Sequence, residues 1–141
     1  MQQPSKQQHR KWQKGRIGGV STKGSSLCFG TFGIKAIQAG AISAKHIESV
    51  RILLTRVLGK NGKLWIRVFP DVPFTRKPAG VRMGSGKGDQ EFFGCKIRPG
   101  VVLFEVSGVP YSVLMDVFKV VGDKLPIKIK VIKDRELANI S

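Results

Sequence analysis

Apolar residues recur at helical spacing in one stretch near the middle of the chain. From Ile47 to Leu58 they follow one another at intervals of about three and four residues, the period of one helix face. Ser43 is of a type that caps helix N-termini, and Gly59 is of a type that ends helices. The pattern therefore predicts an amphipathic helix over residues 44–58.

A second helical pattern begins at Pro110, which suits a first helical turn, and runs to Gly122. Its many valines weaken the local helix propensity, because β-branched side chains lose rotamer freedom in a helix. Packing against the rest of the domain must therefore hold this helix in place.

Alternation with a period of two predicts strands at residues 64–69 and 127–131. After the first of these, Pro70 and Pro73 are expected to end regular pairing. The stretch from Pro70 to Gln90 then shows no clear pattern, so we expect a long loop there.

Two short apolar runs at residues 92–97 and 101–106 flank Arg98-Pro99-Gly100. Proline presets φ at one turn position and glycine accepts a positive φ at the next, so these runs predict a β-hairpin. Its second arm would place Val102, Phe104 and Val106 on one face, against the helices.

These elements predict an α+β fold with a mixed sheet and two helices. We divide the chain into an arm (1–26), one domain (27–135) that contains a loop at 70–90, and a short tail (136–141). The arm is rich in Gln, Lys, Arg and Gly and shows no periodicity, so it either orders on a partner or stays a disordered tail. Trp12 among several cations favours RNA contact.

The charge is high and unevenly distributed. The chain carries a formal net charge of +16, and residues 1–88 contain 17 Lys or Arg but only Glu48 and Asp71 as acids. Residues 89–141 contain eight basic and seven acidic residues. Such an excess is stable only beside a polyanion, so the front part of the chain is expected to bind nucleic acid.

The side chains expected to contact RNA are the cations of the arm, the first helix and the following strands, together with one aromatic ring. The cations of the first helix are equally compatible with a solvated face. The full set is Lys6, Arg10, Lys11, Trp12, Lys14, Arg16, Lys23, Lys35, Arg51, Arg56, Lys63, Arg67, Arg76 and Lys77.

Residues 74–88 hold four cations, no acid and several glycines. Glycine lets the backbone approach a crowded surface and offer N–H groups to phosphates. We expect a functional loop made of Arg82, Met83, Gly84, Ser85, Gly86, Lys87 and Gly88. It is not a nucleotide-binding P-loop, because Gly88 and Asp89 follow the lysine and no helical pattern comes next.

Catalysis and metal binding find little support in the sequence. Cys28 and Cys95 are far apart, the only histidines are His9 and His46, and no nucleophile with its base is recognisable. We expect no enzyme activity, no metal, no cofactor, no membrane span, no disulfide and a structural role for His46. The cysteines are expected to be small buried apolar residues.

The element from Phe29 to Ala36, Phe-Gly-Thr-Phe-Gly-Ile-Lys-Ala, has two readings. Its phenylalanines are candidates for stacking on RNA bases. A bend anchored in the core explains the same residues, and we favour this packing role.

Several motifs resemble one known family. They are Lys14-Gly15-Arg16, the Phe29–Ala36 element, residues 62–71 (GKLWIRVFPD), Lys77-Pro78, residues 81–88 (VRMGSGKG), Lys96-Ile97, Pro99-Gly100, Gly108-Val109-Pro110 and Lys124-Leu125-Pro126. In this order and spacing, they resemble bacterial-type ribosomal protein L-sixteen.

The resemblance implies an α/β-hammerhead-like fold and a structural role in the large ribosomal subunit. The implied partners are large-subunit rRNA, the 5S rRNA region, A-site tRNA and neighbouring ribosomal proteins, with no membrane and no homo-oligomer. Arg82, Met83 and Lys87 would then support the RNA that holds the A-site tRNA near the peptidyl transferase centre.

Two departures from the family pattern stand out. Ser85 replaces a lysine that is common in the family, and Gln38-Ala39-Gly40-Ala41 lacks arginines that often precede the first helix. They suggest a ribosome in an organelle, a mitochondrion or plastid, slightly more than one in the bacterial cytoplasm. Because the resemblance starts near Met1, we expect no presequence. A free RNA-binding regulator and a nucleic-acid-processing enzyme are the alternatives.

Overall fold

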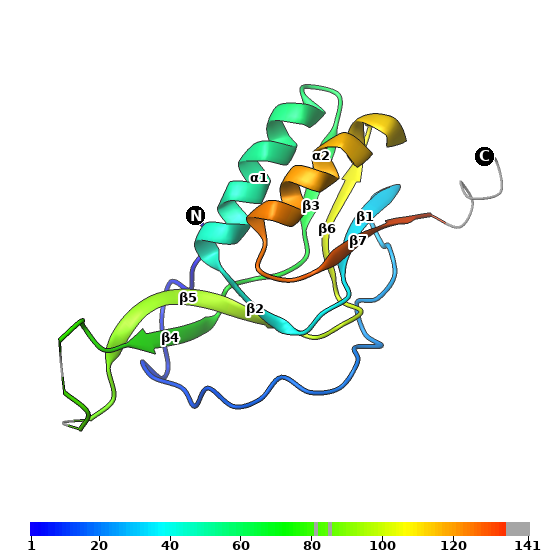
Figure 1. Ribbon diagram of the computed structural model, residues 1–141. Helices are drawn as coiled ribbons and strands as arrows, with labels where there is room; N and C mark the ends of the chain where they lie inside the picture. Colours follow the sequence, from blue (N-terminus) through cyan, green and yellow to red (C-terminus); the bar gives the residue numbers. More distant parts are fainter. Residues whose placement is uncertain (81, 85, 135–141) are drawn as a thin grey trace.

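The structure, a computed structural model, describes residues 1–80, 82–84 and 86–134. Within these residues the chain forms seven strands and two helices (Figure 1). In chain order they are β1 (Phe32–Ala36), β2 (Gly40–Ser43), α1 (Ala44–Leu58), β3 (Lys63–Ile66), β4 (Val72–Arg76), β5 (Asp89–Ile97), β6 (Val102–Ser107), α2 (Tyr111–Lys124) and β7 (Ile129–Lys133).

The body of the molecule is a four-stranded sheet in the order β3-β6-β1-β7, covered on one face by α1 and α2 lying side by side (Figure 1). Ile34 of β1 and Phe104 of β6 are fully buried in a core that also takes in Val50 and Leu54 of α1 and Val121 of α2. Burial of these apolar side chains is the main force that holds the layers together.

The second sheet has three strands in the order β2-β5-β4. The β4–β5 hairpin projects away from the helical layer, and residues 77–88 connect the two strands at its far end (Figure 1). Phe74 and Phe92 stack across the hairpin with ring centroids 5.0 Å apart. This cross-strand pair helps to stiffen a part of the molecule that has no helix over it.

The α+β class and both helices are confirmed, but the predicted mixed sheet is wrong, because all strand pairs in both sheets are antiparallel. The first helix matches its prediction of residues 44–58. The second runs two residues past Gly122, to Lys124, with Pro110 as its N-cap. A side chain at Gly122 would meet open space, so this glycine sits in the helix without ending it.

The predicted hairpin between residues 92–97 and 101–106 is also wrong, although its turn exists. Gly100 has φ +99°, and the Val101 N–H donates to the Arg98 carbonyl at 3.4 Å. The two strands then enter different sheets, β5 between β2 and β4 and β6 between β3 and β1. A strand has two hydrogen-bonding edges, and both edges of both strands already have partners.

Pro73 does not end strand pairing as predicted, because it lies inside β4 opposite Phe93. The strand β4 is at the edge of its sheet, where a residue without an N–H is tolerated. The predicted loop at 70–90 is therefore shorter, since residues 72–76 and 89–90 belong to strands.

The predicted strands at 64–69 and 127–131 exist with shifted bounds. The first ends at Ile66, although the Arg67 N–H still donates to the Leu103 carbonyl at 2.9 Å. The second begins at Ile129. Strands β1 and β2 were not predicted, because glycines interrupt their apolar pattern. In β1, a Cβ at Gly33 would lie 2.5 Å from the Leu27 side chain, so close packing requires glycine there.

The first turn of α1 is closed by a capping box. The His46 N–H donates to Ser43 Oγ and the Ser43 N–H donates to His46 Nδ1, each at 3.2 Å. This confirms the structural role expected for His46. Each bond satisfies an N–H group that the helix itself leaves unpaired.

We predict that Ser43→Ala lowers the free energy of unfolding by about 1 kcal/mol, because it leaves the His46 N–H without its acceptor. Urea denaturation measures this loss. Ser49→Ala is the matched control: Ser49 is exposed and its hydroxyl only donates to the Lys45 carbonyl of the same helix. Equal losses in the two variants would show that the cap contributes nothing specific.

Candidate nucleic-acid interface

The N-terminal arm runs beside β5 and the turn into β6, in the same order along both segments. Its first contact is a hydrogen bond from Gln7 Nε2 to Gln90 Oε1 at 3.1 Å. Farther along, the Lys96 ammonium donates to the Lys14 carbonyl at 2.5 Å, and the Ser21 N–H donates to the Pro99 carbonyl at 2.9 Å. The arm thus follows the sheet without forming a strand or a helix (Figure 1).

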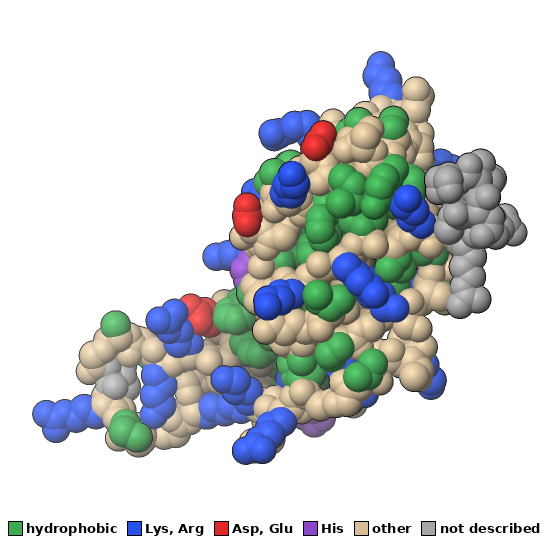
Figure 2. All heavy atoms as spheres, turned by 45° about the vertical axis from the view of Figure 1, so that its right-hand side comes forward, with side chains coloured by type: hydrophobic (Ala, Val, Ile, Leu, Met, Phe, Trp, Pro, Cys, Tyr) green, Lys and Arg blue, Asp and Glu red, His purple; other side chains and the backbone are tan. Residues whose placement is uncertain are grey.

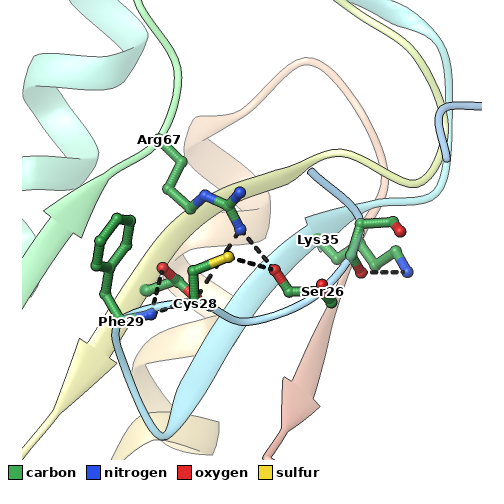
Figure 3. A network of polar contacts seen from close by, with 7 residues as sticks. Ser26, Cys28, Phe29, Lys35 and Arg67 are labelled. Atoms are coloured by element: carbon green, nitrogen blue, oxygen red, sulfur yellow. Dashed lines mark hydrogen bonds and ion pairs between the residues drawn. The ribbon is translucent and has the colours of Figure 1, made fainter. Parts of the chain in front are cut away.

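A buried carboxylate holds the end of this arm. Glu105 of β6 has 0% exposure, and its Oε1 accepts the Cys28 N–H at 2.6 Å (Figure 3). The Phe29 N–H lies 3.3 Å from Oε2, and Arg67 Nη1 lies 3.9 Å from Oε1. A buried carboxylate is costly unless it is paired and hydrogen-bonded, and here the two N–H groups and the guanidinium meet that need.

Arg67 and Lys35 also grip the arm directly. Arg67 Nη1 donates to the Ser26 carbonyl at 2.6 Å, and Lys35 Nζ donates to the Ser25 carbonyl at 3.0 Å (Figure 3). Both side chains were predicted to contact RNA. The structure gives each of them an internal partner, so their first role is to position residues 25 and 26.

Most of the predicted RNA-contacting side chains are exposed. They are Lys6, Arg10, Lys11, Trp12, Lys14, Arg16, Lys23, Arg56, Lys63 and Arg76. The remaining four, Lys35, Arg51, Arg67 and Lys77, are half-buried. The structure therefore brings the arm cations and the hairpin cations to one extended side and leaves those of α1 apart from them.

Arg51 on α1 is already paired. Its guanidinium donates to both carboxylate oxygens of Glu48, at 2.5 and 2.9 Å. This pairing lowers the pKa of the Glu48 carboxyl and raises the pKa of Arg51. A phosphate at Arg51 would compete with Glu48, which favours the solvated-face reading for this residue.

The tip of the β4–β5 hairpin carries the predicted loop residues. Arg82, Gly84, Gly86 and Lys87 are exposed, as is Met83, whose exposure reaches 101%. Lys77 Nζ donates to the Gly84 carbonyl at 2.5 Å, across the base of the loop. Ser85 lies outside the described residues.

Two features of the loop backbone require glycine. Gly84 and Gly86 have φ of +105° and +89°, a region that other L-residues rarely adopt. At Gly88 a Cβ would lie 2.6 Å from the carbonyl carbon of Arg76, where the chain re-enters the hairpin. The glycines thus shape a loop that presents its cations outward.

The arm and the loop also contact each other. The Lys87 ammonium donates to the Trp12 carbonyl, and Lys11 Nζ donates to the Lys87 carbonyl at 3.1 Å. Trp12, Lys14 and Lys87 line one wall of a hollow of about 190 Å³, and Phe74 and Arg76 lie on the hairpin side. The two segments predicted to bind RNA therefore form one continuous surface.

Two parts of this surface escaped sequence reasoning. Lys96 was not among the candidates, although it holds the arm at Lys14; no periodicity or charge run marks it. Phe29 was expected to pack in the core. It is 62% exposed and stacks on Trp65, whereas Phe32 is half-buried and packs against Tyr111. The packing interpretation is thus confirmed for Phe32 and wrong for Phe29.

The nearly neutral part of the chain presents a different surface. Figure 2 shows hydrophobic side chains gathered over the body of the molecule, while Lys and Arg side chains stand out from the projecting hairpin. Exposed apolar residues of α2 include Tyr111, Val113 and Val120. Charge and apolar area are therefore separated in space as well as along the chain.

The cysteines differ from each other. Both are free, but Cys28 is exposed, so its expected burial is wrong; it lies on the irregular segment anchored by Glu105. Cys95 on β5 is half-buried, and this burial, together with Asp71, raises the pKa of its thiol to about 11.

No group of three His, Cys, Asp or Glu side chains that could hold a metal ion is found in the described part of the chain. Among the same residues, neither helix has the length and apolar character needed to cross a membrane. The chemistry that the surface offers consists of cations, backbone N–H groups and exposed aromatic rings.

A small α+β protein with its free cations concentrated on an arm and a projecting hairpin is of the polyanion-binding class. Residues 4–132 match the family model described as ribosomal protein L16p/L10e. The chain therefore belongs to the ribosomal protein L16p/L10e family. This membership makes it a structural protein of the ribosome and not an enzyme, and RNA binding is typical of the family.

Two bacterial relatives are similar over almost their whole lengths. Large ribosomal subunit protein uL16 of Albidiferax ferrireducens is 45% identical over 128 residues, which cover 91% of this chain and 93% of the relative. The protein of the same name from Maricaulis maris is 45% identical over 132 residues, which cover 94% and 96%. These bacterial relatives do not support the expected lean toward an organelle.

We predict that Glu105→Ala lowers the free energy of unfolding by about 3 kcal/mol, because it leaves a guanidinium and two N–H groups without their buried partner. Hydrogen exchange at the Cys28 and Phe29 amides should accelerate as well. The matched control is Glu91→Ala, which removes a half-exposed carboxylate 3.5 Å from Arg76 and should cost less than about 1 kcal/mol. Similar effects of both variants would contradict the anchoring role.

We also predict that the two thiols react at very different rates. At about pH 8 the exposed Cys28 should react rapidly with a chromogenic disulfide reagent. Cys95 should react slowly, because its raised pKa keeps nearly all of the thiol protonated and its burial limits access. Cys28→Ser should abolish the fast phase, and urea should make Cys95 reactive. A fast phase that survives in Cys28→Ser would contradict this assignment.

Proposed function

We propose that the chain is a structural protein of the large ribosomal subunit that binds large-subunit rRNA and helps to position A-site tRNA near the peptidyl transferase centre. Family membership together with the continuous cationic surface of arm and hairpin supports this proposal. Its relatives at 45% identity are named as large-subunit proteins.

In this proposal the chain works in three parts. Residues 1–26 are the arm, residues 27–135 are the RNA-binding domain, and residues 136–141 are a short tail outside the described residues. The domain is a variant of the α/β-hammerhead fold. The exposed arm cations, with Lys63, Arg56 and Arg76, neutralise rRNA phosphates, while Lys35 and Arg67 act mainly by holding the arm.

The hairpin tip is the part that approaches the tRNA. It stands farthest from the helical layer, and its described residues carry Arg82 and Lys87 with no acid among them (Figures 1 and 2). Long-range attraction to phosphates and exposed N–H groups suit it to support folded RNA. The peptidyl transfer chemistry itself would belong to RNA, and the protein would fix the shape of its surroundings.

The other partners follow from the same placement. We propose contacts with the 5S rRNA region and with neighbouring ribosomal proteins. The exposed apolar residues of α2 suit a protein neighbour better than a phosphate backbone. No homo-oligomer and no membrane contact form part of this function.

We predict a steep salt effect on RNA binding. About 6 to 10 phosphate contacts would reduce the affinity by about 10³- to 10⁵-fold between about 50 and 200 mM salt. Filter binding of the purified chain to large-subunit rRNA measures the slope. A flat response would exclude phosphate contacts as the source of affinity, and failure to sediment with large subunits would favour a free RNA-binding regulator.

We predict that the double variant Arg82→Ala with Lys87→Ala impairs tRNA binding in the A site of reconstituted ribosomes several-fold while the melting temperature stays within about 2 °C. Both residues are exposed, so little native packing is lost. The matched control is Lys119→Ala with Lys124→Ala on α2, which removes the same charge from exposed positions of the nearly neutral part. Equal impairment by the two double variants would point to net charge alone.

A further inference from the structure

An exposed pair of stacked aromatic rings lies beside the basic surface. The rings of Phe29 and Trp65 have centroids 6.1 Å apart and planes that differ by 19°, which is an offset stacked arrangement. Phe29 is nevertheless 62% exposed, so most of its ring surface is not covered by the protein. The pair therefore offers an open aromatic face to a ligand.

The backbone under this pair is fixed. The Phe29 N–H is held by both oxygens of the buried Glu105, at 3.3 and 3.4 Å. At Gly30 a Cβ would lie 2.7 Å from the Val106 carbonyl oxygen, and the next N–H, of Thr31, donates to that carbonyl at 3.0 Å. Figure 3 shows the Phe29 ring standing clear of the network that holds its backbone. An exposed ring on such a support is preorganised for binding.

Cations flank the rings on the same strand. Lys63, Trp65 and Arg67 occupy alternate positions along β3 and its extension, so their side chains leave the strand on one side. Lys63 is exposed, and Arg67 is fixed at the Ser26 carbonyl, 2.6 Å from its Nη1. The carboxylate of this group, Glu105, is fully buried and does not offset their charge at the surface.

From this arrangement we infer that Phe29 and Trp65 form a binding site for one unpaired nucleobase of RNA, which stacks on the open face of Phe29 while Lys63 contacts the adjoining phosphate. Arg67 keeps the arm under the ring and adds positive potential. A base within a duplex is already stacked on both faces, so the ligand must be a base turned out of its helix or part of a single strand. This inference rests on the proposed RNA-binding function.

The test uses the full chain carrying Trp12→Phe, which leaves Trp65 as the only tryptophan. The probes are an oligoadenylate of about ten nucleotides and a ribose-phosphate oligomer of the same length without bases. We expect the oligoadenylate to bind about tenfold more tightly than the abasic oligomer and to quench the fluorescence of Trp65. The abasic oligomer should bind through its phosphates with little quenching.

Substitutions then separate stacking from charge. Phe29→Leu keeps apolar area but removes the ring, so it should abolish the preference for bases and leave abasic binding unchanged, whereas Phe29→Tyr should retain the preference. Lys63→Ala should weaken both probes equally and reduce the salt slope by about one. Ile52→Ala, which truncates an exposed apolar residue on α1, should change neither measurement.

Equal affinity for the two probes, each falling with salt, would overturn the nucleobase site and leave the proposed RNA binding intact. Binding of neither probe would overturn both. The quenching experiment needs no substitution at Phe29, so it stays decisive even where Phe29→Leu lowers the melting temperature. If Phe29→Leu keeps the preference for bases, the open face of Phe29 is the docking point of an apolar protein side chain and the inference is wrong.

Discussion

The hydrogen-bonded carboxylate of Glu105 is the interaction on which the arrangement of the cationic surface depends. It lies on the central strand β6, on the opposite side of the strand from Phe104 and Val106. By accepting the N–H groups of Cys28 and Phe29 and facing Arg67, it ties the end of a strongly basic arm to the middle of the main sheet. The direction of the arm, the exposure of Phe29 and the position of Arg67 all follow from that one buried charge.

The rest of the cationic surface is organised by lysines that bind backbone carbonyls. Lys11, Lys87 and Lys96 each donate to a carbonyl of the facing segment, which joins the arm to the projecting hairpin. A lysine ammonium has three donors and keeps its full charge in such a contact. These residues can therefore hold the two segments together and still attract phosphates, which explains how so basic a surface has a defined shape.

Sequence reasoning succeeded where local signals were strong. Ser43 and Gly59 bound the first helix because capping depends on residues close in sequence, and the charge asymmetry before Lys87 located the basic surface. It failed where partners are distant. The strands around Gly100 both exist, but the turn gave no sign that they would enter different sheets. Pro73 appeared to break a strand, because tolerance of proline depends on the edge position of β4.

By itself the sequence determined the fold class, both helices, the concentration of positive charge and the family, since these depend on composition, local periodicity and motifs in order. Only the tertiary structure decided which cations are free. Arg51 is paired with Glu48, Lys35 and Arg67 hold the arm, and Phe29 is turned outward. The reason is physical: a side chain's partners are set by strands and segments far away in the chain, and no local pattern records which of them will meet.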